Sequence, residues 1–124
     1  METIFDAHCP TRAIFEDISK KWVALVVILL SEKPLRFSEL LAGASGVSQK
    51  VLTQTVRTLE RNGIVSRTVD SRTVPITVVY ALTTLGESLV APIQTMQGWT
   101  ERHRDEVYEA QHVYDLSKTS LERG

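Results

Sequence analysis

The sequence predicts one mainly α-helical domain with a single β-hairpin, and three observations support this fold class. Apolar residues recur at helical spacing in several separate segments of the 124-residue chain. Serine, threonine, proline and glycine stand at the ends of those segments, where helices begin and end. Two runs rich in β-branched residues, "IVSRTV" and "ITVVYAL", flank a loop of turn-forming residues, which is typical of a hairpin.

Composition excludes several classes of protein. The hydrophobic share of 43% and the charged share of 23% are ordinary for a globular domain. One cysteine can form no internal disulfide, so a secreted scaffold held by disulfides is excluded. The longest apolar stretch, residues 22–30, is far shorter than the roughly 20 residues that span a bilayer. Because the first residues also show no signal-peptide pattern, we expect a cytoplasmic protein.

Two helices are predicted near the start of the chain. Pro10 suits the first turn of a helix, and Ser19 is a candidate cap for a second helix over residues 20–31. The β-branched residues of this second segment suit a strand equally well. Pro34 marks its end, because proline cannot continue the hydrogen-bond ladder.

Two further helices follow, separated by a glycine-containing turn. Ser38 is a candidate cap for a short helix in "RFSELLAGA". Ser48 caps a longer helix in "GVSQKVLTQTVRTLERNG", and Gly63 stops it. The apolar residues of this longer helix follow the i, i+4, i+7 rule and are expected to face a core. They are Leu52, Val56 and Leu59.

A hairpin and a long helix complete the predicted fold. The hairpin loop, "DSRTVP", gives the hairpin a basic tip. Thr83 or Thr84 caps the long helix. We expect residues 1–112 to form the domain and residues 113–124 to form a loosely ordered tail. The long helix carries an apolar stripe made of Leu85, Leu89, Ile93, Met96 and Trp99.

Positive charge is concentrated around the longer helix and the hairpin. Residues 48–72 hold five basic and two acidic residues, a net charge of +3, whereas the rest of the chain has a net charge of −4. An asymmetry of this kind indicates a surface that meets a polyanion.

The order of the elements describes a winged helix-turn-helix, in which the basic β-hairpin is the wing. The second helix of the pair presents amides and cations that suit the major groove of DNA. Gln49 and Gln54 can pair with adenine, Lys50 and Arg57 with guanine, and Thr53 with thymine or phosphate. A polar face that only meets water is the alternative, but the cap, the turn and the basic hairpin together favour double-stranded DNA.

Five segments resemble the HxlR family of bacterial and archaeal transcription regulators, over about residues 9–103. They are "CPTRAIFEDISKKW", "FSELL", "GVSQKVLTQTVRTLERNGIVSR", "VYALTTLG" and the tryptophan at position 99. The resemblance implies a repressor or autoregulator that binds a near-palindromic operator as a homodimer, joined through its N- and C-terminal helices. We assign the DNA contacts to Ser38, Ser48, Gln49, Lys50, Thr53, Gln54, Arg57, Arg67 and Arg72. We assign the dimer interface to Ile14, Leu89, Ile93, Met96 and Trp99.

Cys9, the single cysteine, has two open roles. It can be a small apolar residue that packs, or a thiolate stabilised by a helix N-terminus with help from His8 or Arg12. The resemblance implies the second role, because several HxlR-type regulators sense oxidants or electrophiles, such as quinones and aldehydes, with a cysteine at this place. If Cys9 only packs, the alternative is a regulator with a small-molecule inducer bound at the dimer interface. A winged-helix module that binds a protein is a third reading.

No motif in the chain argues for an enzyme or a cofactor. The three histidines, His8, His103 and His112, lie far apart and lack the spacing of metal ligands. We therefore expect neither catalysis nor a metal site.

Overall fold

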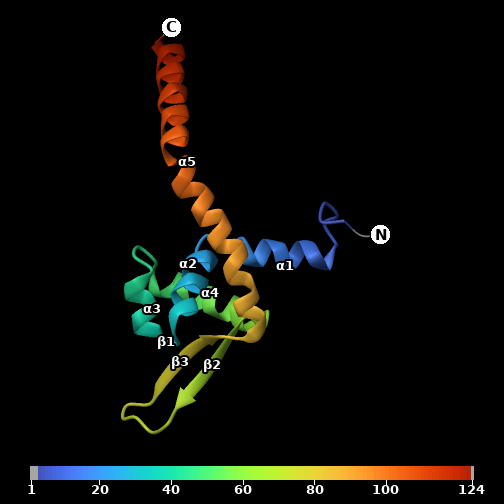
Figure 1. The fold of residues 1–124 in the computed structure, drawn as a ribbon, viewed down its shortest axis with the longest axis vertical. Helices are drawn as coiled ribbons and strands as arrows, with labels where there is room; N and C mark the ends of the chain where they lie inside the picture. Colours follow the sequence, from blue (N-terminus) through green and yellow to red (C-terminus); the bar gives the residue numbers. More distant parts are fainter. Residues whose placement is uncertain (1–2, 124) are drawn as a thin grey trace. The chain divides into compact units, whose positions relative to one another are not determined.

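The computed structural model describes residues 3–123, which form helices and one small sheet in two compact units, Met1–Ala91 and Pro92–Gly124 (Figure 1). The last helix belongs to both units. In chain order the elements are α1 (Pro10–Ile18), α2 (Val23–Glu32), β1 (Leu35–Arg36), α3 (Phe37–Gly43), α4 (Gln49–Arg61), β2 (Val65–Asp70), β3 (Thr77–Leu82) and α5 (Thr84–Arg123). The mainly helical class with a hairpin is confirmed.

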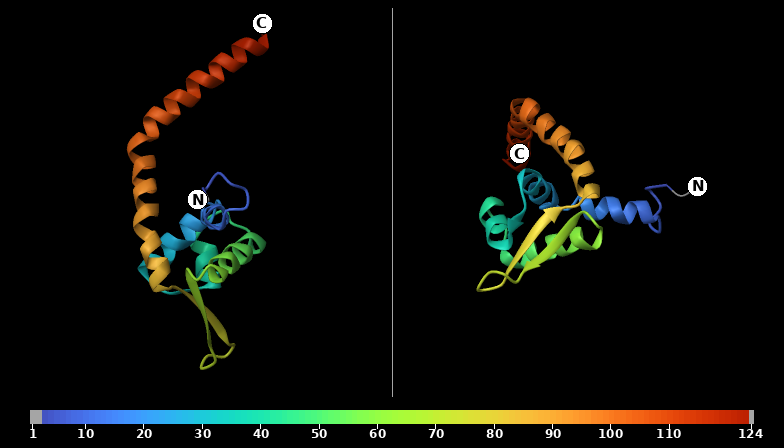
Figure 2. Two further views of the ribbon diagram at one scale, coloured as in Figure 1. Left: turned by 90° about the vertical axis from the view of Figure 1, so that its right-hand side faces the viewer. Right: turned by 60° about the horizontal axis from the view of Figure 1, so that its bottom comes forward.

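The sheet has three antiparallel strands in the order β1-β3-β2. The predicted hairpin is β2 and β3, which pair from Val65 opposite Leu82 to Asp70 opposite Thr77. Figure 2 shows the hairpin extending away from helices α1–α4. Strand β1 was not predicted, because two residues are too few for an alternating pattern. It exists only through its pairing with β3, which places Leu35 opposite Tyr80.

The core of the first unit lies between the helices and the sheet. The helical stripe predicted for α4 is confirmed, since its three apolar side chains are at most 2% exposed. Segment 23–32 is a helix and not a strand, because it is buried through Val23, Val26, Val27 and Leu30, which helical spacing brings to one side. Leu40 of α3 completes this core.

Two predicted helix caps are wrong. Helix α2 begins at Val23 rather than at residue 20, and Ser19 instead follows α1, where its N–H donates to the carbonyl of Phe15 (3.0 Å). Helix α3 begins at Phe37, so Ser38 lies inside its first turn. The N-cap there is Arg36, whose backbone N–H donates to Oε1 of Glu39 (2.9 Å). The carboxylate of Glu39, in the first turn, therefore accepts a hydrogen bond at the start of α3, and the hydroxyl of Ser38 does not cap the helix.

The ends of α4 and the start of α5 agree with the sequence. Ser48 Oγ accepts a hydrogen bond from the N–H of Val51 (3.1 Å), and Gly63 adopts a φ of +75° just beyond the helix. Thr83 Oγ1 accepts from the N–H of Gly86 (3.0 Å), so Thr83 caps α5. Only glycine fits at position 86 without a shift, because a Cβ there would overlap the carbonyl oxygen of Ile64.

Helix α5 is longer than the sequence suggested. It continues to Arg123, so the described part of the segment after residue 112 is helical. The physical reason is that this segment holds no proline or glycine before residue 124 and many good helix formers. Residues 1, 2 and 124 of the two predicted ranges lie outside the described residues. Among the described residues, no helix combines the length and the apolar character needed to cross a bilayer.

Candidate nucleic-acid interface

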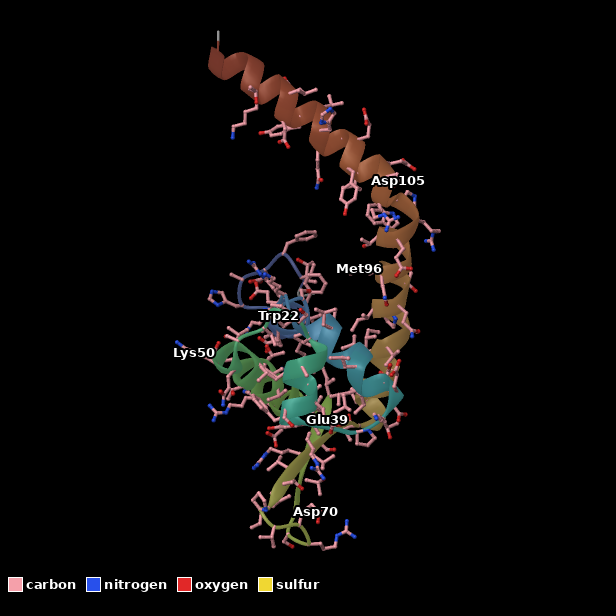
Figure 3. All side chains as sticks on the ribbon, turned by 90° about the vertical axis from the view of Figure 1, so that its left-hand side faces the viewer. Trp22, Glu39, Lys50, Asp70, Met96 and Asp105 are labelled. Carbon is pink, nitrogen blue, oxygen red and sulfur yellow. The ribbon has the colours of Figure 1, made fainter. Side chains whose placement is uncertain are left out.

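The polar face of α4 is the centre of the candidate site. Gln49, Lys50, Gln54 and Arg57 are all exposed, and Lys50 points away from the helix into solvent (Figure 3). The apolar face of the same helix is buried, so the helix cannot rotate to hide these side chains. The structure thus presents two amides and two cations along one exposed surface, which is the donor and acceptor set suited to base edges.

The hydroxyl groups on α4 have structural duties. Ser48 Oγ is the N-cap acceptor, and Thr53 Oγ1 donates to the carbonyl of Gln49 (2.8 Å). The Ser48 hydroxyl can therefore still donate its proton to a ligand, whereas the Thr53 hydroxyl can only accept a hydrogen bond from one. Ser38 is exposed but stands on α3 and not on α4.

The turn between α3 and α4 is tight. Gly46 has a φ of +94°, a conformation that side chains disfavour and that the chain needs to reverse direction here. Together with the α4 cap at Ser48, this turn fixes the direction in which α4 leaves the body. The pair of helices has the order and connection of a helix-turn-helix.

The wing meets α4 at a shared cleft of about 460 Å³. Gln49, Thr53 and Arg57 line it from α4, while Arg67 and Tyr80 line it from the hairpin. The cleft also holds an acidic residue that the sequence reasoning missed. Glu60 Oε2 lies 3.6 Å from Nε of Arg67, so this predicted DNA contact is paired inside the protein. Both side chains are more than 40% exposed, so the pair is weak and can open.

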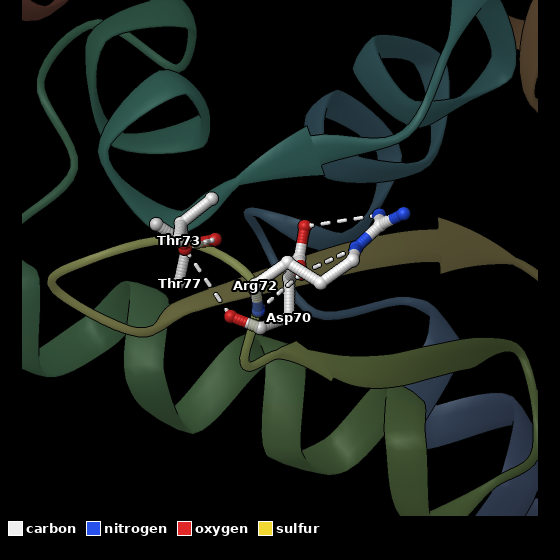
Figure 4. Close-up of polar contacts among 4 residues, drawn as sticks. All are labelled: Asp70, Arg72, Thr73 and Thr77. Atoms are coloured by element: carbon white, nitrogen blue, oxygen red, sulfur yellow. Dashed lines mark hydrogen bonds and ion pairs between the residues drawn. The ribbon is translucent and has the colours of Figure 1, made fainter.

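Arg72 at the wing tip is also paired (Figure 4). Its Nε and its backbone N–H donate to Oδ1 of Asp70, each at 3.0 Å, and its Nη2 donates to Oδ2 at 3.3 Å. These bonds from Arg72 hold the pKa of Asp70 below its usual range. The sequence signal for this pair was the spacing Asp-Ser-Arg in a turn, since an aspartate often bonds the backbone two residues on.

Cys9 stands at the N-terminus of α1, where it is the N-cap residue. It is 4% exposed. The backbone N–H of Arg12 lowers the pKa of the thiol, the burial opposes this, and the N–H and hydroxyl of Thr11 lower it further. The Arg12 guanidinium, one of the two expected charged neighbours, instead donates to Glu16 (2.8 Å) and to the carbonyl of Phe5 (3.3 Å).

Several residues assigned to a dimer interface carry exposed apolar surface. In the first unit, Ile14 is 52% exposed and Leu89 is half-buried. In the second unit, Met96 is 70% and Trp99 is 51% exposed, and Ile93 is half-buried. Trp99 stacks on His103 with ring centroids 4.8 Å apart. Within the described residues, no three His, Cys, Asp or Glu side chains gather as a metal site.

These features together define a class of protein. A helix-turn-helix with a polar second helix and a two-stranded wing is the architecture of a winged-helix DNA-binding regulator. Comparison with known proteins gives the family. The chain belongs to the HxlR-like helix-turn-helix family, whose model matches residues 17–108. It is therefore a helix-turn-helix transcription regulator and not an enzyme.

Individual relatives agree with this assignment. The chain is 34% identical over 104 residues to the uncharacterised HTH-type transcriptional regulator YtfH of Escherichia coli K12, covering 84% of this chain and 82% of YtfH. The solved structure of a putative transcriptional regulator, ytfH from Salmonella typhimurium, has a TM-score of 0.82 at 29% identity and covers 90% of this chain and 99% of its own. Diamide-treated YodB from Bacillus subtilis has a TM-score of 0.65 at 35% identity, covering 78% and 96%.

Proposed function

We propose that the chain binds a near-palindromic DNA operator as a homodimer in the cytoplasm, and that it acts as a repressor or autoregulator of transcription. One observation carries the DNA-binding step. Four exposed amide and cationic side chains line one face of α4 while its opposite face is locked in the core. Two such helices, spaced by one turn of DNA (about 34–36 Å), would read the two half-sites of a palindrome.

The test begins with selection of bound sequences from random duplex DNA by the purified protein. Replacing Gln54 or Lys50 by alanine should relax the preference at one fixed operator position, at a cost of about 1–3 kcal/mol per lost bidentate contact. Lys33→Ala, which removes an exposed cation outside α4 and the wing, is the control and should leave binding unchanged. Equal losses on selected and random DNA would show that α4 does not read bases.

We also propose that Cys9 is the site at which an oxidant or electrophile is sensed. The support is its position at a helix N-terminus and the lowered pKa of its thiol, which favours the reactive thiolate. A relative of known structure, YodB, is described as diamide-treated. With no second cysteine in the chain, the products are a disulfide between subunits, a mixed disulfide with a small thiol, or an adduct.

The test of Cys9 compares the protein with Cys9→Ser, which keeps the size of the side chain and removes its redox chemistry. Both should bind the selected operator equally before treatment. Diamide or a quinone should then change DNA binding of the natural chain and leave the serine variant unaffected. If both respond alike, Cys9 is not the sensor.

A second candidate is a regulator that responds to a small molecule, with Cys9 as a packing residue. Two observations favour it. Cys9 is almost fully buried, and a cleft of about 430 Å³ opens between the end of α2, the end of β3 and the start of α5. If this second candidate is correct, a small-molecule inducer should release DNA from the Cys9→Ser variant as readily as from the natural chain.

A further inference from the structure

Helix α1 is joined to the rest of the first unit near its C-terminal end. None of its residues is buried, and Ile14 and Phe15 are exposed along it. Figure 1 shows α1 extending away from the other helices of this unit. Asp17, in the last turn of α1, is half-buried, and its Oδ2 accepts a hydrogen bond from Nδ2 of Asn62 at the end of α4 (3.1 Å). Because α1 has so little buried surface, its direction depends on individual contacts of this kind.

The bond between Asp17 and Asn62 is charge-assisted and partly shielded from water. The Asp17 side chain is 24% exposed, and its Oδ1 also lies 3.4 Å from Nζ of Lys20. The Asn62 amide is the main cause that holds the pKa of the Asp17 carboxyl below its ordinary value, so this carboxyl is charged near neutral pH. Asn62 is itself held in place, because the same Nδ2 donates to the carbonyl of Thr58 in the last turn of α4 (2.8 Å). A hydrogen bond to a charged group is stronger than one between neutral groups, so this bond fixes the end of α4 against α1.

The start of α5 is attached to the same end of α4. Thr83 Oγ1 donates to the carbonyl of Gly63 (2.6 Å), and the Thr83 N–H donates to the carbonyl of Ile64 (3.0 Å). The backbone of α5 lies directly against that Ile64 oxygen, since a Cβ on Gly86 would overlap it. Residues 62–64 are therefore a junction at which both α1 and α5 are attached to α4.

The helices that meet at this junction are those expected at the dimer interface. Ile14 lies on α1, and Leu89 lies on α5. In a homodimer, a second copy that packs on these two helices is connected to α4 through the junction. Two α4 helices bind a palindrome well only when their separation matches that of its half-sites.

We propose that Asp17 and Asn62 are positioning residues for operator recognition: their hydrogen bond fixes α4 against α1 and so sets the half-site spacing that the dimer accepts. This inference rests on the proposed DNA binding as a homodimer. Neither side chain has to touch DNA, because both act through the direction of α4. One base pair more between the half-sites moves one of them by about 3.4 Å and turns it by about 35° around the DNA axis. A firmly held α4 cannot follow such a shift, whereas a loosely held α4 can.

The first experiment compares operators of different spacing. The natural chain selects its operator from random duplex DNA, and the centre of that operator is then lengthened or shortened by one base pair. The natural chain should bind the altered operators more weakly, and equal binding of all spacings would overturn the inference. Asp17→Ala should reduce this discrimination by about 2- to 30-fold, the range expected of a coupling contact. Its affinity for a duplex with one half-site should stay unchanged, because the polar side chains of α4 are untouched.

Glu16→Ala is the matched control. Glu16 is the neighbouring carboxylate on α1, is exposed, and binds Arg12 of the same helix (2.8 Å). Each substitution removes one negative charge and one ion pair from α1, but the one at Asp17 also breaks the bond to α4. Glu16→Ala should therefore discriminate between spacings like the natural chain. Equal discrimination by the two variants would show that the bond to Asn62 does not set the spacing.

An exchange of the two side chains tests the bond itself. Asn62→Asp places a second carboxylate against that of Asp17 and should lose spacing discrimination as Asp17→Ala does. Asp17→Asn/Asn62→Asp lets an amide on α1 donate to a carboxylate on α4, and should restore the discrimination to within about twofold of the natural value. Both proteins lack the amide that binds Thr58, so the loss of that bond cannot explain a difference between them. If the double variant folds but discriminates no better than Asn62→Asp, the inference is wrong.

The outcomes separate this inference from the proposed function. If the natural chain selects a palindrome and Asp17→Ala keeps the full discrimination between spacings, the inference fails and the proposed function stands. If the natural chain selects no DNA sequence, or sediments as a monomer, the proposed function fails and the inference fails with it. Asp17→Ala should sediment as a dimer like the natural chain. If it is a monomer instead, the bond supports assembly rather than spacing, and the inference is wrong.

Discussion

Helices α4 and α5 both carry apolar side chains at helical spacing, but those of α4 are buried and many of those of α5 are exposed. The apolar residues of α4 are buried by the chain itself, and only its polar face meets solvent. The part of α5 in the second unit, from Pro92 onward, leaves many of its large apolar side chains exposed, among them Met96, Trp99, Tyr108 and Tyr114. An exposed apolar stripe of this kind marks a contact surface, and in the proposed homodimer it would meet a second copy of the chain.

The difference teaches which part of the molecule each function depends on. The core formed by α2, α3 and α4 needs only intramolecular contacts, since these helices bury one another's apolar residues. The proposed dimer depends on the helix whose apolar side chains remain exposed. Changes in α4 should therefore alter folding or base reading, whereas changes in the second unit should alter assembly.

The largest expected effect comes from removing the exposed part of α5. A chain ending at Thr95 should be monomeric and lose about 10²- to 10⁴-fold in operator affinity, because the two half-sites are then bound independently. Sedimentation and operator titration measure both properties. If the natural chain sediments as a monomer at micromolar concentration, the exposed part of α5 does not form a dimer and the contrast with α4 is wrong.

Next in size is the contrast between two apolar truncations. Leu52→Ala, in a fully buried position, should lower the free energy of unfolding by about 2–5 kcal/mol. Met96→Ala, at a position 70% exposed, should change the stability of a monomer by no more than about 0.5 kcal/mol. In a dimer it should instead weaken association and so reduce the stability that the dimer adds at a given protein concentration. Denaturant unfolding at two protein concentrations separates these cases.

The cap of α4 should have a smaller effect. Ser48→Ala removes the acceptor of the Val51 N–H and should cost about 1 kcal/mol of stability. Ser45→Ala, an exposed serine in the preceding turn, is the control and should cost much less. If the two variants unfold at the same denaturant concentration, the cap does not stabilise α4.

The smallest expected effect is a pH dependence at the C-terminal end of α4. The amide of Asn62 donates to Oδ2 of Asp17 (3.1 Å) and, with Lys20, holds the pKa of that carboxyl below its ordinary value. Since the pKa is lower in the folded chain, this stabilisation is complete above the ordinary pKa of about 3.9. It is lost as pH falls through the folded pKa. Asn62→Ala should reduce this acid dependence, measured by unfolding between neutral and acidic pH.

Local sequence rules determined much of the α4 region. Ser48, Gly63 and the i, i+4, i+7 spacing of Leu52, Val56 and Leu59 specify where α4 begins, ends and faces, because capping and periodicity act within a few residues. The hairpin and the Thr83 cap are local in the same sense. The positions of the polar side chains on α4 follow directly from this, so the centre of the candidate site was predictable.

Other features were decided by tertiary structure. Strand β1 exists through its pairing with β3, and Arg67 is paired because the fold brings Glu60 to it. For Cys9 the sequence supplied the helix N-terminus, but only packing could bury the thiol and leave backbone N–H groups as the main cause of its lowered pKa. Long-range contacts of this kind depend on how the elements meet in space, which no local pattern encodes.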